Sequence, residues 1–361
     1  MATGTATDSA FSESASKATT GNFADKTTTL QVDNLVVDIP LAAGVLHAVR
    51  GISFYVDQGE TLCIVGESGC GKSLTSLALM NLLPSKAVRT ADRIELSGAD
   101  LRPMTERQMS DLRGKKMAMI FQEPMTSLNP AYTIGNQLEE AVLRHQKISG
   151  AQARERAIYL LERVGITAAA SRLQQYPHQL SGGLRQRVMI AMALMCGPDL
   201  LICDEPTTAL DVTIQAQILH LLKDLQREFE MAVVLITHDL GVVARLADRV
   251  AVMYAGEIVE TGSANEIFAD PRHPYTQGLL RCIPVPGRTK RGDHLGSIPG
   301  VVPSLIGDIH GCAFANRCEH ANDVCHSAVT ERQLGEDRTV RCVLASANKG
   351  AQPDVPAQAR S

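Results

Sequence analysis

Three features are missing from this 361-residue sequence, and each absence narrows its class. No apolar run approaches the roughly 20 residues that span a bilayer, because a Gly-Pro-Asp break at Gly197 interrupts the longest tract, residues 188–203. There is no basic tract and the formal net charge is −4, which argues against a nucleic-acid groove. No apolar segment typical of a signal peptide precedes Lys26, so we expect a cytoplasmic chain.

Length and cysteine content then describe what the chain does contain. At about 150 residues per domain the length predicts two domains, and a hydrophobic fraction of 45% is enough for a core. Nine cysteines without a secretion signal predict thiols or metal ligands rather than disulfides. Residues 1–28, rich in Ala, Ser and Thr, are expected to be a disordered leader, and residues 348–361 a disordered tail.

The most informative segment is a glycine-rich loop between an apolar strand at 61–65 and a helix at 74–80. It reads Gly66-Glu67-Ser68-Gly69-Cys70-Gly71-Lys72-Ser73. This order of strand, loop and helix predicts a P-loop, whose backbone N–H groups and helix N-terminus cradle phosphates. Lys72 is expected to reach the β- and γ-phosphates and Ser73 to bind Mg²⁺. The alternative is a glycine-rich turn that matches by chance, and the flanking elements make it the weaker interpretation.

Two adjacent carboxylates, Asp204 and Glu205, end a second apolar strand. In an open α/β sheet such acids lie at the carboxyl edge, where ligands bind. Asp204 suits the Mg²⁺ shell through water, and Glu205 suits polarising the water that attacks the γ-phosphorus.

A second glycine pair, Gly182-Gly183, follows Ser181, a natural N-cap, and opens an apolar helix. This Leu-Ser-Gly-Gly-x-x-Gln-Arg stretch, which includes Gln186, resembles the signature motif of the ABC ATPases. Other markers of that family follow expected strands: the Q-loop residue, the D-loop segment and the switch histidine are Gln122, Ala209-Leu210-Asp211 and His238.

The resemblance implies a role for each marker. ATP is expected on the P-loop, with Mg²⁺ held by Ser73 and Gln122, and Glu205 and His238 are expected to be catalytic. In this family the signature of one cassette closes over the nucleotide of another, which implies nucleotide contacts for Ser181, Gly182, Gly183, Gln186 and Asp211. Because the sequence has no internal repeat, the resemblance implies that the single cassette pairs with a second copy of itself or with a homologous chain, and we expect the homologous chain.

One position departs from the family pattern. ABC cassettes usually stack the adenine on an aromatic residue upstream of the P-loop, and Ile39 occupies that place. An aliphatic contact keeps dispersion but loses ring stacking, worth about 0.5–1.5 kcal/mol in aromatic pairs.

These patterns predict an α/β fold with strands alternating with helices. The resemblance implies an ABC ATPase cassette at residues 29–268, with a RecA-like parallel core, an antiparallel β lobe and a helical subdomain at about 123–195. Residues 269–347 are expected to form a small Cys-containing extension.

The extension narrows the resemblance further. Its segments 269–280, 297–303 and 311–318 resemble the C-terminal region of dipeptide and oligopeptide ABC importer ATPases, as do residues 122–130 and 176–179. The resemblance implies a peripheral subunit on the cytoplasmic face of a bacterial inner membrane, with a homologous second ATPase, two permeases and, indirectly, a solute-binding protein. The same machine carrying nickel, a glycoside or another solute is one alternative. A soluble ABC ATPase acting on DNA or the ribosome is another, but it predicts a long coiled coil or tandem cassettes, and the sequence has neither.

Four cysteines cluster in the extension: Cys312, Cys318, Cys325 and Cys342. Four thiolates can hold zinc or a [4Fe–4S] cluster. The paired C-x₂-C knuckles of structural zinc sites are absent, so spacing alone leaves four free thiols as an equal alternative. The family resemblance implies the [4Fe–4S] cluster, with zinc as the other metal.

Overall fold

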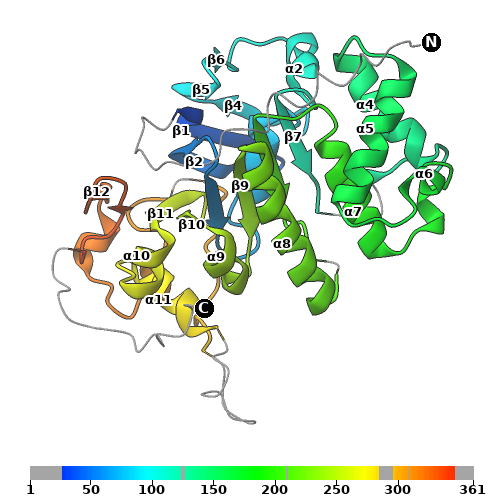
Figure 1. Cartoon of the computed structure of the whole chain (residues 1–361). Helices are drawn as coiled ribbons and strands as arrows, with labels where there is room; N and C mark the ends of the chain where they lie inside the picture. The colour runs from blue at the N-terminus through cyan, green and yellow to red at the C-terminus, as the bar shows by residue number, and fades with distance from the viewer. Residues whose placement is uncertain (1–26, 123–126, 209, 284–295, 308, 346–361) are drawn as a thin grey trace, which may run out of the picture.

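The computed structural model describes residues 27–122, 127–208, 210–283, 296–307 and 309–345 (Figure 1). Nearly all of the expected leader and the whole tail at 348–361 lie outside these residues. Residues 123–126 of the segment that follows Gln122, and Ala209 of the D-loop, also lie outside them.

The core is an eight-stranded sheet with the order β12-β13-β11-β10-β3-β9-β8-β7. Its five parallel strands are β3 (Thr61–Val65), β7 (Met117–Ile120), β8 (Leu200–Asp204), β9 (Ala232–Thr237) and β10 (Arg249–Tyr254). Alternate side chains of these strands enter two different hydrophobic clusters: Cys63 and Val65 join one, and Leu62 and Ile64 the other. Both faces of the sheet are therefore buried, which explains why the strands read as continuous apolar runs.

A separate antiparallel sheet is formed by strands from the amino-terminal part of the cassette. It is formed by β1 (Thr28–Leu41), β2 (Gly44–Asp57), β5 (Arg93–Leu96) and β6 (Ala99–Asp100), with β4 (Val88–Thr90) paired to β1. The helices α1 (Lys72–Leu79) and α2 (Glu106–Leu112) belong to the same half of the chain. The sheet packs on the core through residues such as Leu30, Ile52 and Phe54.

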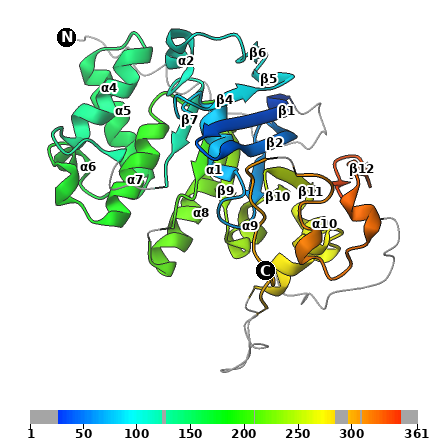
Figure 2. The same cartoon turned by 180° about the vertical axis from the view of Figure 1, so that it is seen from behind.

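Helices fill the space beyond β7. The helical lobe consists of α4 (Ile134–His145), α5 (Gly150–Arg163), α6 (Ala169–Arg172) and α7 (Gly182–Ala193), which pack on one another. Three of these helices begin at side-chain caps, Thr133, Ser149 and Ser181. In Figures 1 and 2 this lobe lies at the opposite end of the molecule from the extension. Other cassette helices in the described part of the chain include α8 (Val212–Phe229), α9 (Leu240–Leu246), α10 (Ala264–Ala269) and the short η1 (Pro177–Gln179). The predicted fold, with its parallel core, antiparallel lobe and helical region, is confirmed.

The extension continues the core sheet instead of forming a detached unit. After β11 (Glu257–Ser263) and α11 (Pro274–Arg281), the chain returns as β12 (Arg332–Gln333) and β13 (Thr339–Val340), and β13 pairs with β11. Two short turns of helix, η2 (Ala315–Arg317) and η3 (Asp323–His326), lie between.

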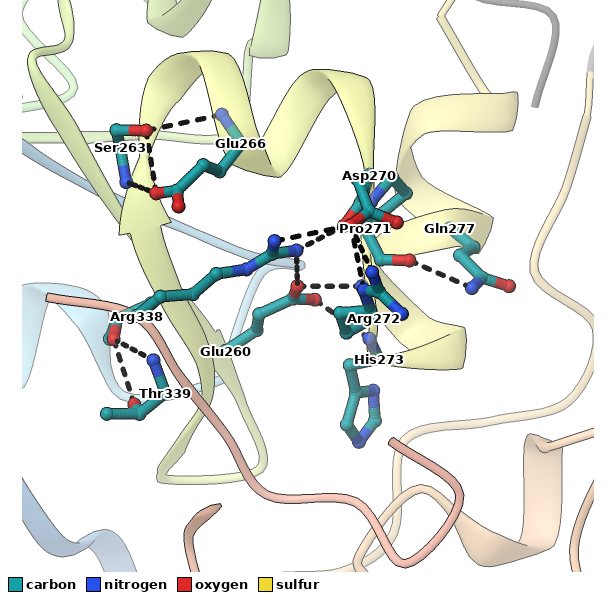
Figure 3. A network of polar contacts seen from close by, with 11 residues as sticks. Glu260, Ser263, Glu266, Asp270, Pro271, Arg272, His273, Gln277, Arg338 and Thr339 are labelled. Atoms are coloured by element: carbon teal, nitrogen blue, oxygen red, sulfur yellow. Dashed lines mark hydrogen bonds and ion pairs between the residues drawn. The ribbon is translucent and has the colours of Figure 1, made fainter. Parts of the chain in front are cut away.

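A buried polar network fastens this junction (Figure 3). Glu260 of β11 is fully buried and accepts hydrogen bonds from the backbone N–H groups of Arg272 and His273, at 2.7 and 2.9 Å. The guanidinium of Arg338 lies 3.6 Å from Glu260 and 3.3 Å from Asp270. Burial raises the pKa of Glu260, and these donors oppose that rise. One carboxylate thus joins the strand, the start of α11 and the returning chain.

Glu260→Gln tests this junction. The glutamine keeps the size of the side chain but removes the charge that faces Arg338, and it places an NH₂ donor near backbone N–H groups. We expect a loss of about 3 kcal/mol in the free energy of unfolding, measured by urea denaturation. The control Glu228→Gln breaks the more exposed pair with Arg163 and should cost at most about 1 kcal/mol. Equal losses in the two variants would contradict the importance of the network.

Candidate active site

The P-loop makes its turn against two neighbouring strands. A Cβ at Gly66 would lie 2.1 Å from the carbonyl oxygen of Met253, and one at Gly71 would lie 2.3 Å from that of Ala48. Gly71 has φ 102° and is the N-cap of α1, with no side-chain cap hydrogen bond. The first N–H groups of α1 are therefore left for a ligand, as an anion site at a helix N-terminus requires.

Two backbone carbonyl groups of this loop hold the side chain of Lys72. It is only 4% exposed, and its Nζ donates hydrogen bonds to the carbonyl oxygens of Gly66 and Glu67, at 2.8 and 2.9 Å. Ser68 and Gly69 at the tip of the loop are exposed, whereas Cys70 is buried. A buried ammonium beside an exposed loop tip places positive charge where an anion could bind.

Ser73 and Asp204 meet although they are 131 residues apart. The hydroxyl of Ser73 donates to Oδ1 of Asp204 at 3.0 Å. Asp204 ends β8 and is 6% exposed, and burial raises its pKa, with Ser73 and Lys72 opposing the rise. A hydroxyl and a carboxylate side by side form a set of oxygen ligands that suits Mg²⁺.

Three side chains contact the carboxylate of Glu205 at the carboxyl edge of the sheet. Its Oε2 accepts from Nε2 of Gln122 at 3.0 Å and from the hydroxyl of Thr208 at 2.9 Å, and its Oε1 lies 3.1 Å from Nδ1 of His238. Glu205 itself has φ 46°, a left-handed conformation directly after β8. The turn separates its carboxylate from that of Asp204, so the two adjacent acids serve different partners.

The electrostatics keep Glu205 ionised. Burial raises the pKa of its carboxyl, but the hydrogen bonds from Thr208 and His238 and the charges of His238 and Lys72 outweigh burial, so the pKa lies below its usual value. An ionised carboxylate is the form that polarises a water molecule.

The structure thus brings Ser73 to Asp204, and Gln122 and His238 to Glu205. The sequence interpretation missed Thr208, whose only signal was its place three residues after Glu205. It also missed two contacts from the extension to Glu67: the hydroxyl of Tyr275 accepts from its backbone N–H, and Arg317 pairs with its carboxylate.

The signature residues make their hydrogen bonds inside the helical lobe and its neighbours. Ser181 caps α7 by accepting from the N–H of Leu184, and the buried Gln186 donates to the carbonyl oxygen of Pro206 at 2.6 Å. Ser181 and Gly182 are exposed. Asp211 caps α8, whose Ile214 lies 3.2 Å from the Cβ position of Gly183. The start of α7 is thus capped by a side chain and exposed to solvent.

Ile39 lies on β1 opposite Leu46, is partly buried and packs against the core. The extension reaches this hairpin too, because Leu46 forms an isolated bridge with Ile306. The contact between Ile39 and a base stays a prediction.

The four extension cysteines converge. All four carry free thiols and line one small cavity together with His273 and Phe314. Burial raises the pKa of Cys312 to about 11, with the neighbouring cysteines adding to the rise. Within the described ranges, no three His, Cys, Asp or Glu side chains form a ready-made metal site.

Comparisons with known proteins identify the family of this chain. Residues 49–208 match the family described as ABC transporter, and residues 259–325 match the family described as oligopeptide/dipeptide transporter, C-terminal region. The dipeptide transport ATP-binding protein DppD of Bacillus subtilis is 51% identical over 317 residues, which cover 87% of this chain and 94% of DppD. The oligopeptide transport ATP-binding protein OppD of B. subtilis is 53% identical over 81% of this chain and 82% of OppD. DppD of Escherichia coli is 51% identical over 87% of this chain and 95% of that protein.

Solved structures show the same cassette. A dimeric post-hydrolysis state of the ATP-binding cassette MJ0796, bound to ADP and Pi, is 26% identical with a TM-score of 0.59, over 65% of this chain and 98% of that one. The structure of cbiO1 from Clostridium perfringens is 27% identical with a TM-score of 0.58, over 68% and 92%. Within the described part of the chain, no helix combines the length and the apolar character that crossing a membrane requires.

Thr208→Val tests the electrostatics of Glu205. Losing a hydrogen bond that stabilises the ionised carboxylate raises the pKa of Glu205, so the acid limb of the pH profile for nucleotide hydrolysis should move to higher pH. Thr208→Ser keeps the hydroxyl and should retain the wild-type profile. An acid limb that does not move in Thr208→Val would show that Thr208 does not tune this carboxylate.

Proposed function

Because the chain belongs to the ATP-binding subunits of dipeptide and oligopeptide ABC transporters, we propose that the site described above hydrolyses ATP to power peptide import. The convergence of Gln122, Thr208 and His238 on Glu205, beside the P-loop residues Lys72 and Ser73, is the observation that carries this proposal.

Each side chain has a defined part in this reaction. The backbone N–H groups at the start of α1 and the ammonium of Lys72 bind the phosphates. Glu205 orients the attacking water and accepts its proton, while His238 holds Glu205 on its other oxygen.

Magnesium fits the oxygen ligands that the site offers. Ser73 and Asp204 present a hydroxyl and a carboxylate to one point, and the amide of Gln122 donates its NH₂ to Glu205, which leaves its carbonyl oxygen for the cation. Bound Mg²⁺ would neutralise charge on the phosphates.

The exposed signature motif supports hydrolysis in a pair of cassettes. Ser181 and Gly182 face solvent at the start of α7, whereas the P-loop of the same chain contacts other elements, β2, β10 and the extension. We infer that the signature of a second ATPase chain completes this site, and that the second chain is a homologous, distinct one. If ATP binds the closed pair of cassettes more tightly than ADP does, nucleotide binding and hydrolysis shift the pair between closed and open states. This shift can move a partner that is coupled to the cassettes.

The partners follow from the family. As a subunit of a peptide ABC importer, the chain works with membrane permeases. We infer two permeases, an indirect role for a solute-binding protein, and a peripheral location on the cytoplasmic face of the bacterial inner membrane. The segment from Gln122 to Pro130 is the proposed docking place for a permease, and its residues 123–126 lie outside the described residues.

Reconstitution of the complete importer in lipid vesicles tests the function. With ATP inside and the solute-binding protein outside, the wild-type complex should import labelled dipeptides or oligopeptides. Glu205→Gln should bind ATP but turn over about 10²–10⁴-fold more slowly, because it lacks the base. Lys72→Ala should lose ATP binding itself.

Matched controls are Glu155→Gln and Lys86→Ala, which change exposed side chains away from the site. Full turnover of Glu205→Gln would refute its assignment as the base. Import of nickel or a glycoside instead of peptides would refute the substrate class. A transport-active homodimer of this chain would refute only the distinct second ATPase.

We further propose that Cys312, Cys318, Cys325 and Cys342 hold a [4Fe–4S] cluster outside the ATP site. Two observations support a sulfur-rich centre there. All four thiols line one cavity, and His273 lines the same cavity with a buried Nε2 that has no partner among the described residues. Nδ1 of His273 accepts the N–H of Tyr275 at 3.0 Å, so the proton is on Nε2, and a cysteine thiolate would satisfy this donor. A bound cluster would supply a covalent brace for the irregular chain, or a one-electron redox centre.

Anaerobic purification of the full-length chain tests this centre. We expect brown protein with about four iron and four sulfide per chain, and loss of both in Cys318→Ser. The control Cys282→Ser changes a cysteine outside the set and should retain them. Colourless protein without iron would reject the cluster, and one equivalent of zinc would support the alternative metal.

A further inference from the structure

The extension reaches directly into the P-loop at Glu67. The carboxylate of Glu67 forms a two-pronged ion pair with Arg317, whose Nη1 and Nη2 lie 2.6 and 3.0 Å from its two oxygens. The two residues are 250 positions apart in the sequence. Neither the phosphate cradle nor the hydrolytic group requires this contact.

Arg317 is fixed by its own surroundings. Its side chain is 4% exposed. Besides Glu67, it donates from Nε to the carbonyl oxygen of Pro299 at 2.9 Å, from Nη2 to that of Ile298 at 3.0 Å, and from Nη1 to the hydroxyl of Tyr254 at 3.3 Å. These five bonds use all five N–H donors of a guanidinium. The extension and β10 therefore fix the position of the guanidinium of Arg317, and this position determines where the carboxylate of Glu67 can pair with it.

Tyr275 restrains the backbone of Glu67. Its hydroxyl accepts the N–H of Glu67 at 2.9 Å. The ring is fully buried and packs at 4.5 Å from Tyr254 and 5.4 Å from Phe314, measured between ring centroids. In a sequence with 4% aromatic residues, these three gather behind one P-loop residue. The hydroxyl thus has little freedom to move away from the loop.

The restrained residue, Glu67, is itself a hydrogen-bond partner of Lys72. The carbonyl oxygens of Gly66 and Glu67 accept the hydrogen bonds of Lys72, so the position of Glu67 determines where this ammonium rests. We propose that Arg317 and Tyr275 are positioning residues of the ATP site: the extension holds the first half of the P-loop in its binding conformation. This inference rests on the proposed ATP site at residues 66–73. If the extension positions the P-loop, then the affinity of the site for nucleotide depends on residues of the extension as well as on those of the cassette.

A purely structural ion pair would behave differently. Breaking a buried pair destabilises the fold wherever it lies, but it changes ligand affinity only if the pair favours the binding conformation. The decisive readout is therefore the dissociation constant of ATP in folded protein, together with the coupling between the two partners.

The experiment is a double-mutant cycle on the full-length chain, with Mg²⁺ and a fluorescent ATP analogue as the probe. Arg317→Met and Glu67→Gln should each raise the Kd about tenfold, within the range typical of coupled sites. The double variant should be no weaker than either single one, because the second change removes an interaction already lost. Tyr275→Phe keeps the ring and should raise the Kd roughly threefold through one lost hydrogen bond.

Hydrogen exchange adds a readout that does not depend on affinity. The Glu67 amide should exchange faster in Tyr275→Phe than in the wild type, since its acceptor is gone. The control Arg281→Met removes an exposed arginine of α11 and should change neither the Kd nor this exchange rate.

The outcomes separate the possible failures. A wild-type chain that does not bind the ATP analogue would refute the proposed ATP site. A wild-type chain that binds, with Kd values unchanged in folded Arg317→Met and Tyr275→Phe, would refute the positioning role, as would fully additive effects in the cycle. If Arg317→Met does not fold, Tyr275→Phe decides alone.

Discussion

The close approach of the P-loop backbone to β2 and β10 is the constraint that positions the candidate site. At Gly66 and Gly71 a Cβ atom would collide with the carbonyl oxygens of Met253 and Ala48, so β10 and β2 admit only a bare backbone there. The start of α1 has no side-chain cap, and its Ser73 reaches Asp204 at the carboxyl end of β8. The positions of Lys72 and Ser73, which we propose for phosphate and Mg²⁺ binding, follow from that turn.

The parallel sheet brings the polar residues of the candidate site together. The strands β7, β8 and β9 lie side by side in parallel, so the residues that follow them meet at one edge although they are far apart in sequence. Gln122, Glu205 and His238 each come just after one of these strands. The left-handed conformation of Glu205 turns its carboxylate toward the other two, while Asp204 remains with Ser73.

Sequence patterns were sufficient where local chemistry decides the structure. Apolar runs located the strands, the glycine-rich segment lies between β3 and α1 as expected, and Ser181 caps α7 as its residue type predicts. They were insufficient for the extension, whose irregular chain is positioned by tertiary contacts. Arg317 and Tyr275 carry no motif of their own that points to Glu67, and the cavity shared by four cysteines depends on how loops return to β11.

Amide hydrogen exchange of the full-length chain, with and without Mg·ATP, tests whether the P-loop binds the nucleotide, because it locates the bound nucleotide on the sequence. We expect slower exchange on ATP addition at residues 69–73, whose N–H groups are proposed to bind the phosphates, and no such protection when Lys72 is replaced by alanine. Protection elsewhere in the chain with no change at residues 69–73 would contradict it.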